Sequence, residues 1–392
     1  MKTAKFNPKL FIIFFFALII LFLFNSCKKK NSDSNIIDDS SLISIMENTQ
    51  NTIGSPGWML EIQDHNKYYK YAGGLANREE KIPMEDNFQI RIGSISKTFT
   101  ATVVLILCDE GVLKLNDKLE DYYPEFPKSD KITIRQLLMH TSGIVTWDEN
   151  DSIRTQVYEN TYDWTIDKLI DWASKQELLF EPDSGFNYSN IGYFLLGKII
   201  ETASGSSVID LINEKICDPL NLENTFMAAS PQFAGEMIHG YDESGGTIED
   251  ITGTPAADAI NFELSWTAGG IISSLDDLSV WSRALYKGKL ISDSLLEQQM
   301  PVLNPPTENN PYYSGYGMGI KQSDKWIGHN GAISGYVCYM FYYPERDVSV
   351  VTFFNKFSAF DAEVNLSDIT AVGQNFMEVA KYVCPETLIP VP

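Results

Sequence analysis

The stretch FQIRIGSISKTFTATVVLILCDEG, residues 88–111, joins a short apolar strand pattern to a long apolar helix pattern. Gly93 lies at the junction, and Ser94 and Lys97 follow it at a spacing of three. Side chains three positions apart share one face of a helix, so the hydroxyl and the amine are expected to be neighbours. Ser94 would also lie at the N-terminus of this helix, where backbone N–H groups converge and the helix dipole favours negative charge. The pattern therefore indicates a nucleophilic serine assisted by a lysine, and the structural alternative is a capping serine beside a solvated lysine.

Composition restricts the classes of protein to consider. The chain has 392 residues, of which 44% are hydrophobic and 12% aromatic, so it can form one large domain or two closely packed ones. The formal charge is −22, with no basic cluster outside the N-terminal segment, which argues against nucleic acid as a partner. The four histidines are scattered and contain no HExxH, so no metal site is expected.

Four cysteines follow residue 100, and none of them forms a CxxC motif. Their pairing cannot be derived from the sequence. They are Cys108, Cys217, Cys338 and Cys384.

The N-terminal segment has the layout of an export signal. Three lysines within residues 1–10 precede the apolar run FIIFFFALIILFLF, which at 14 residues is short for a membrane-spanning helix. Ser26 and Cys27 follow, and they resemble the lipobox of bacterial lipoproteins. We therefore expect residues 1–26 to be a signal peptide and residues 27–45 a flexible tether. The resemblance implies export and a lipid anchor at Cys27, on the periplasmic face or the cell surface. The alternatives are a plain membrane anchor and an ordinary cleavable signal.

Hydrophobic periodicity predicts strands at both ends of residues 46–392 and helices in the middle. Strand patterns cover residues 57–63, 67–76 and three segments between 325 and 355. Helix patterns cover residues 133–140, 165–176, 191–205 and 275–287, and a last helix carries apolar residues from 369 to 383. The simplest architecture is an α/β layer built by both ends of the chain, with a helical region at about residues 106–260 inserted in it.

Two further motifs follow the Ser94–Lys97 pair in the sequence. FNYSNIGYFLLG places Tyr188 and Asn190 just before a predicted helix, and WIGHNGAISGY places His329 on a predicted strand. The order Ser-x-x-Lys, Tyr-x-Asn, His-x-Gly resembles the serine β-lactamase and penicillin-binding protein family, in its class C-like branch. The segments LLMHTSG and TAGGIISSLDDLSVW are similar to phrases of that family, and the resemblance spans about residues 54–355. It implies a β-lactamase/DD-peptidase-like fold, with a mainly antiparallel sheet flanked by helices.

The resemblance also implies roles for these residues. Ser94 would form an acyl-enzyme, and Lys97 would lower the barrier to proton transfer. Tyr188 would be the general base, as a phenolate or through Lys97, and would then protonate the leaving group. Asn190 would hold Lys97 and the substrate amide. The backbone N–H groups of Ser94 and Ala332 would form the oxyanion hole. No metal or organic cofactor is implied.

The third motif departs from the Lys-Thr-Gly that is usual in class C β-lactamases, because it reads His329-Asn330-Gly331. In the family, histidine there is more common in DD-peptidases, D-amino-acid peptidases and esterases. All three residues are expected to bind substrate, with His329 on a substrate carboxylate and Gly331 letting the substrate lie against the strand. A neutral imidazole would hold a carboxylate weakly. His140 is expected either to line the cleft or to cap a helix.

Three hypotheses for the function follow. The first is a serine hydrolase that acts on the scissile acyl bond of a small molecule or peptide, with DD-peptidase, D-amino-acid peptidase or esterase activity. The second is a true class C-type β-lactamase. The third is a non-catalytic ligand-binding member of the fold.

Overall fold

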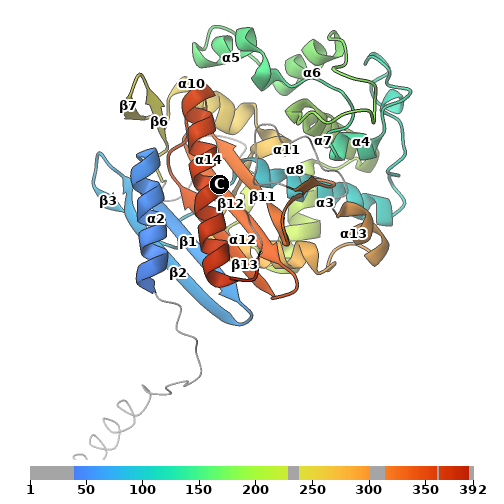
Figure 1. The fold of residues 1–392 in the computed structure, drawn as a ribbon. Coiled ribbons are helices and arrows are strands. Elements are labelled where there is room, and N and C mark those ends of the chain that lie inside the picture. The colour runs from blue at the N-terminus through green and yellow to red at the C-terminus, as the bar shows by residue number, and fades with distance from the viewer. Residues whose placement is uncertain (1–38, 228–237, 301–313, 360–361, 388–392) are drawn as a thin grey trace, which may run out of the picture. The chain divides into compact units, whose positions relative to one another are not determined.

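The computed structural model describes residues 39–227, 238–300, 314–359 and 362–387 (Figure 1). Within these residues the main sheet has eight antiparallel strands, in the order β3-β2-β1-β13-β12-β11-β10-β9. The strands are β1 (Gly57–Asp64), β2 (Lys67–Asn77), β3 (Ile82–Pro83), β9 (Gly315–Tyr316), β10 (Lys321–Ser323), β11 (Trp326–Ile333), β12 (Tyr336–Tyr343) and β13 (Val348–Phe354). The two ends of the chain therefore meet in one sheet, where β1 pairs with β13, as the sequence predicted.

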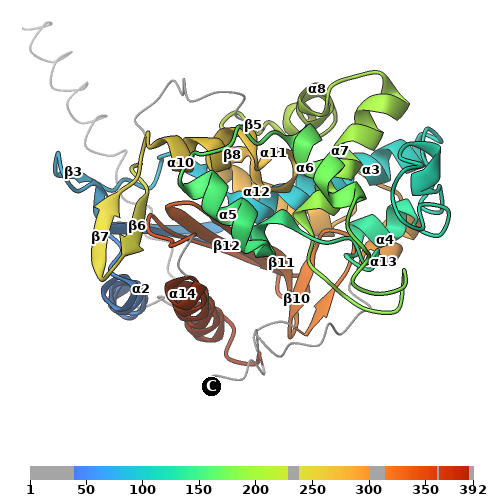
Figure 2. The ribbon, with the colours of Figure 1, turned by 90° about the horizontal axis from the view of Figure 1, so that it is seen from above.

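Helices cover both faces of this sheet (Figure 2). α2 (Asp39–Ile53) and α14 (Ala362–Val383) lie on one face, and α12 (Leu275–Tyr286) packs on the other. Every residue of β12 and β13 is buried as a result, which explains why these strands read as continuous apolar runs.

The predicted tether extends too far into the chain, because α2 begins at Asp39. Leu42 and Met46 of α2 are buried, so residues 39–45 belong to the folded unit. Because this segment is mostly polar, the sequence analysis did not recognise the apolar stripe that holds the helix in place.

The middle of the chain is mainly helical. Around α3 (Ser96–Asp109), which is buried along nearly its whole length, pack α7 (Asn190–Ser204) and α11 (Trp266–Gly269). The other helices are α4 (Ile134–Leu138), α5 (Asp151–Tyr158), α6 (Ile166–Ser174), α8 (Val208–Ile212), α9 (Asp218–Leu220), α10 (Pro255–Asp258) and α13 (Asp293–Gln299). Two small sheets accompany them, formed by β4 (Ile90–Arg91), β8 (Ile271–Ser273) and β5 (Phe226–Met227), and by β6 (Tyr241–Ser244) and β7 (Thr247–Asp250).

Capping residues fix the ends of the helices that carry the motifs. The Ser189 hydroxyl accepts a hydrogen bond from the Gly192 N–H at the start of α7, and Gly205 ends this helix with a φ of 73°. Ser274 caps α12, because its hydroxyl accepts a hydrogen bond from the Asp277 N–H. The helix predicted over residues 133–140 is shorter, because His140 adopts a left-handed φ of 59° that no α-helix can contain.

Within the described residues, no helix combines the length and the hydropathy that crossing a membrane requires. The predicted signal peptide and Cys27 lie outside the described residues. The four cysteines after residue 100 are free thiols.

Candidate active site

Ser94 lies in a short 3₁₀ turn, η1 (Gly93–Ile95), which leads directly into α3. From the sequence, Ser94 was instead expected in the first turn of the α-helix itself. Neither η1 nor α3 has a side-chain cap, so the capping role considered for Ser94 is wrong. The neighbouring Ser96 has a structural role, because it is buried and its hydroxyl accepts a hydrogen bond from the Ile271 N–H at 3.0 Å.

Two glycines allow η1 to pack directly against β11. A Cβ atom on Gly331 would lie 1.8 Å from the Ile92 carbonyl oxygen and 3.1 Å from the Ser94 nitrogen. A Cβ atom on Gly93, whose φ is 49°, would lie 2.9 Å from the Ala332 nitrogen. This close approach brings the backbone of Ser94 beside that of Ala332. A side chain at position 331 would collide with η1, so this packing requires glycine there.

Lys97 is buried next to Ser94, and its amine has three partners. The Lys97 Nζ lies 3.1 Å from the Ser94 Oγ, 2.7 Å from the Asn190 Oδ1 and 2.8 Å from the Ala268 carbonyl oxygen. The last two atoms only accept hydrogen bonds, so a neutral amine donates to both of them and turns its lone pair to Ser94. Burial lowers the pKa of Lys97 well below its ordinary value, Lys321 lowers it further, and Asp148 opposes both. Lys97 can therefore exchange a proton with Ser94 without moving.

Asp148 fixes the orientation of Asn190. The Asn190 Nδ2 donates to the Asp148 Oδ2 at 3.1 Å, which leaves the amide oxygen of Asn190 for Lys97. The Asn190 N–H donates to the Thr146 hydroxyl at 3.2 Å, and Thr146 in turn bonds to Asp148. The sequence analysis did not identify Asp148, since a single aspartate in a loop carries no motif.

Tyr188 presents a buried hydroxyl that finds no hydrogen-bond partner of normal geometry among the described residues. Burial raises its pKa far above the ordinary value, although the nearby Ser94 hydroxyl lowers it in part. The Lys97 Nζ lies 4.8 Å from the centroid of the tyrosine ring. In the free protein Tyr188 is therefore a neutral phenol, which can donate a proton but is a poor base.

A buried chain of hydrogen bonds holds the two histidines of the motif regions. The Ser189 N–H donates to the His140 Nδ1 at 3.1 Å, so the His140 Nε2–H donates to the Tyr316 oxygen at 3.0 Å. The Tyr316 hydroxyl then donates to the His329 Nε2 at 3.3 Å, and the His329 Nδ1–H donates to the Asn330 carbonyl. This sequence of donors satisfies both rings as neutral imidazoles.

The chain of hydrogen bonds corrects the expectation for His329. His329 is fully buried and does not line the cavity beside Ser94, so it is not placed to bind a substrate carboxylate. Burial, together with the nearby lysines, lowers its pKa well below the ordinary value. His140 does not line the cavity, and it ends α4 as expected of a cap: its backbone is left-handed, its N–H donates to the Leu137 carbonyl at 3.4 Å, and the Thr141 N–H donates to the Gln136 carbonyl at 2.9 Å. Its ring also ties the Tyr188–Asn190 motif to the His329 motif.

A cavity of about 320 Å³ opens beside Ser94. Four residues that the sequence analysis named as candidates line it, namely Tyr188, Asn190, Asn330 and Ala332. Its lining also includes Asp148, Arg154 and Lys321, which the sequence analysis missed. Lys321 carries no motif of its own, and only the pairing of β10 with β11 brings it to this place.

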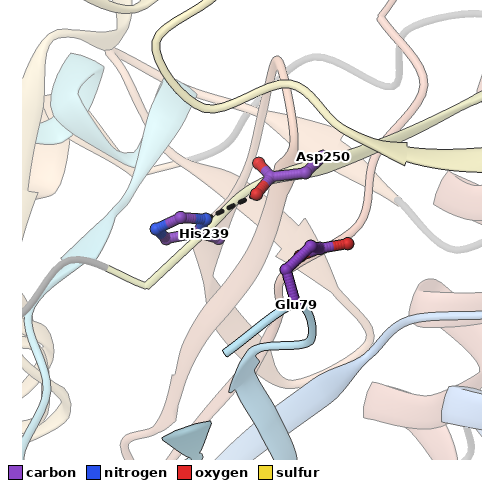
Figure 3. A group of neighbouring side chains, drawn as sticks. All are labelled: Glu79, His239 and Asp250. Atoms are coloured by element: carbon purple, nitrogen blue, oxygen red, sulfur yellow. Dashed lines mark hydrogen bonds and ion pairs between the residues drawn. The ribbon is translucent and has the colours of Figure 1, made fainter. Parts of the chain in front are cut away.

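Glu79, His239 and Asp250 are spaced as metal ligands could be (Figure 3), with ligand atoms within 4.8 Å of one another. Protein groups already occupy these atoms. The two nitrogens of His239 face Asp250 at 2.5 Å and the Asn77 amide at 3.1 Å, and the Glu79 carboxylate bonds to Arg78 and Tyr241. None of the three residues lines the cavity. We regard the group as a polar link between the end of β2 and the β6–β7 hairpin.

The family described as Beta-lactamase matches residues 42–373. The chain belongs to the beta-lactamase family. The fold predicted from the sequence is thereby confirmed, and the chain is assigned to the serine hydrolases of the beta-lactamase family.

The chain is similar to relatives and solved structures that have different names. Penicillin-binding protein 4* of Bacillus subtilis is 29% identical over 324 residues, which cover 76% of this chain and 68% of the relative. A D-aminopeptidase of Brucella anthropi is 25% identical over 353 residues, covering 85% of this chain but only 62% of the relative. The crystal structure of a D-stereospecific amidohydrolase from Streptomyces sp. has a TM-score of 0.74 at 26% identity, and the match covers 89% of this chain and all of that one.

Proposed function

We propose that the chain hydrolyses amides or esters through an acyl-enzyme formed on Ser94. One observation carries this proposal: the Lys97 Nζ lies 3.1 Å from the Ser94 Oγ, while acceptor-only groups take its other two hydrogen bonds. A serine hydroxyl is a weak nucleophile unless a base receives its proton. The buried amine of Lys97, whose pKa lies well below its ordinary value, is such a base when it is neutral, and it is already in place in the free protein.

The proton follows a short route in this mechanism. Lys97 takes the proton of Ser94 as the Ser94 oxygen attacks the acyl carbon. Tyr188, a neutral phenol beside both groups, then donates its proton to the leaving amine or alkoxide and is reprotonated by Lys97. This route departs from the sequence expectation, in which Tyr188 was the general base: Lys97 receives the proton of Ser94, and Tyr188 keeps only the role of protonating the leaving group. Asn190 keeps Lys97 oriented in both of its protonation states.

The tetrahedral intermediate carries a negative charge on the former carbonyl oxygen. We propose that the backbone N–H groups of Ser94 and Ala332 bind this oxygen, as the packing of η1 on β11 supports. Loss of one such donor typically slows catalysis by about 100- to 1,000-fold, or roughly 3–4 kcal/mol.

The substrate class that we propose is that of the D-amino-acid peptidases and amidases, with simple esters as surrogate substrates. The names of the Brucella D-aminopeptidase and the Streptomyces D-stereospecific amidohydrolase support this choice. The β-lactamase alternative is kept for a specific reason. His329, which was expected to hold a substrate carboxylate only weakly, does not line the cavity, and Lys321 lines it instead.

Covalent labelling tests the proposed function. Wild-type protein should gain the mass of one fluorophosphonate adduct, and Ser94→Ala should gain none while keeping its circular dichroism spectrum. Ser96→Ala is the matched control, because it removes a buried structural hydroxyl two residues away. Its labelling should persist. An adduct in the Ser94→Ala protein would show that another residue is the nucleophile, and no adduct in the wild type would favour the non-catalytic reading. Turnover of D- and L-alanine p-nitroanilide and of a chromogenic cephalosporin then separates the substrate classes.

We also propose that the chain is exported and attached to the cell envelope through an acylated Cys27. The support comes from the sequence alone, namely the apolar run before Ser26 and Cys27.

A further inference from the structure

The edge of β11 beside Ser94 is open over only part of the strand. β10 pairs with β11 at residues 326–328, and beyond them no strand of the described residues pairs with this edge. A Cβ atom on Gly93 would lie 2.9 Å from the nitrogen and 3.0 Å from the carbonyl oxygen of Ala332, so both backbone groups of Ala332 face η1 and not β12. Alternate residues of a strand present their backbone groups at the same edge, so those of Ser334 face this side as well.

The side chain of Asn261 closes this edge at its far end. The buried Asn261 Nδ2 donates to the Ser334 carbonyl oxygen at 3.3 Å. Asn261 belongs to a short π-helix, η5 (Ala259–Glu263), and two side chains hold it in place. The Asn261 carbonyl oxygen accepts hydrogen bonds from the Arg91 guanidinium and from the Ser265 hydroxyl, both at 3.2 Å. A substrate that pairs with the edge of β11 as an added strand therefore has to end at Ser334.

The same segment forms one end of the cavity. Residues of η5, of the turn that follows it and of the end of β11 line the cavity there, namely Ile260, Leu264, Ser265, Ile333 and Ser334. The cavity volume of about 320 Å³ lies at the lower end of the range for small-molecule sites, which is roughly 300–1,000 Å³. This end of the site is thus a wall of protein, and the whole cavity suits a small substrate.

The position of the proton donor shows which part of the substrate meets this wall. Tyr188 protonates the leaving group in the mechanism above. The Lys321 Nζ lies 5.3 Å from the centroid of its ring and donates to the Asn330 Oδ1 at 2.7 Å. The leaving group therefore departs at the Asn330 end of the open edge. The acyl part lies on the other side of the acyl carbon, so it runs past Ala332 toward Ser334.

We propose that Asn261 limits the acyl part of the substrate to a single amino-acid residue, so that the chain removes one residue from the N-terminus of an amide or short peptide. This inference rests on the hydrolysis proposed above and adds to it the length of the acyl part. Ala332 and Ser334 are two strand positions apart, about 7 Å, which one residue and its amino group span. A second residue would have to displace Asn261 from the Ser334 carbonyl. A carboxypeptidase, whose acyl part is the rest of the peptide, would not fit.

Two chromogenic amides test the proposal. D-Alanine p-nitroanilide has an acyl part of one residue, and glycyl-glycyl-D-alanine p-nitroanilide has the same residue with a peptide extension. The quantity to compare is the ratio of kcat/KM for the short amide to that for the long one. In the wild type this ratio should be about 10 to 100 or more, the range for leaving a buried polar group without its hydrogen bond. In Asn261→Ala the ratio should fall about 10-fold, because the end of the edge is then open.

Two further variants complete the test. Glu263→Ala is the matched control, because it removes an exposed side chain from the same π-helix, and it should keep the wild-type ratio. If Asn261→Ala loses the circular dichroism spectrum of the folded protein, Asn261→Asp takes its place. Aspartate has nearly the same size as asparagine, but its carboxylate cannot donate to the Ser334 carbonyl, so the ratio should fall here too.

The outcomes separate this inference from the proposed function. A wild type that cleaves the long amide as well as the short one would overturn the limit on length, and so would an unchanged ratio in the Asn261 variants. If the wild type cleaves neither amide, calorimetric titration with the two product acids, D-alanine and glycyl-glycyl-D-alanine, decides the matter. Binding of D-alanine alone by the wild type, with binding of the tripeptide gained in Asn261→Ala, supports the inference, and any other pattern refutes it. Absence of fluorophosphonate labelling of the wild type would count against the hydrolase alone.

Discussion

Glu61 gives a quantitative prediction about stability. It lies in β1 and is fully buried, and neither of its carboxylate oxygens has a hydrogen-bond partner among the described residues. The nearest cation is the Lys70 Nζ at 3.9 Å, and Lys70 also pairs with Asp276. The pKa of Glu61 is raised from 4.5 to about 7: burial is the largest cause, Asp276 adds to it, and Lys70 opposes both.

The sign of the effect follows from proton binding. Between pH 4.5 and about 7 the folded state holds the Glu61 proton more tightly than the unfolded state does. The contribution of Glu61 to stability is therefore complete below pH 4.5 and is lost as the pH rises through about 7. At about 1.4 kcal/mol per pKa unit, the interval corresponds to a loss of roughly 3 kcal/mol.

The substitution Glu61→Gln tests this reasoning, because glutamine is neutral at every pH and has nearly the same shape. Its free energy of unfolding relative to wild type should rise between pH 5 and pH 8 by up to about 3 kcal/mol. Urea unfolding followed by circular dichroism at several pH values measures the difference, in which the contributions of other titrating groups cancel. Glu80→Gln, at an exposed glutamate, is the control and should show no such trend. A difference between wild type and Glu61→Gln that stays constant with pH would refute the reasoning.

Two more predictions concern the oxyanion hole and the anchor. Gly331→Ala places a Cβ atom against the Ile92 carbonyl, so it should separate the Ser94 and Ala332 N–H groups and reduce kcat for ester hydrolysis about 100-fold or more. Gly192→Ala is the control and should have little effect, because the nearest atom to its Cβ would lie at 3.6 Å. Similar rates in the two variants would contradict the assignment of the oxyanion hole. Cys27→Ser should abolish acylation and membrane attachment of the exported protein, and a wild-type mature N-terminus at any residue other than Cys27, found by N-terminal sequencing or mass spectrometry, would rule the lipid anchor out.

Much of the site could be predicted because its parts are local in the sequence. Ser94 and Lys97 are three residues apart, and Tyr188 and Asn190 precede one apolar helix, so periodicity alone places each pair. The strands β1, β2, β11, β12 and β13 were recognisable for the same reason. The residues at which helices begin and end were harder to predict. The start of α2 depends on packing, and the end of α4 depends on the left-handed backbone of His140.

The sequence by itself determined which residues could perform the chemistry, because the three motifs and their order carry that information. Only the tertiary structure decided which of them face the cavity. His329 looked like the substrate's partner, yet its hydrogen bonds to Tyr316 and Asn330 keep it in the core, while Lys321 reaches Asn330 from the next strand. The physical reason is that burial and charge at a site depend on strand pairing and on contacts between distant segments. Asn190, for example, orients Lys97 across 93 positions of the chain.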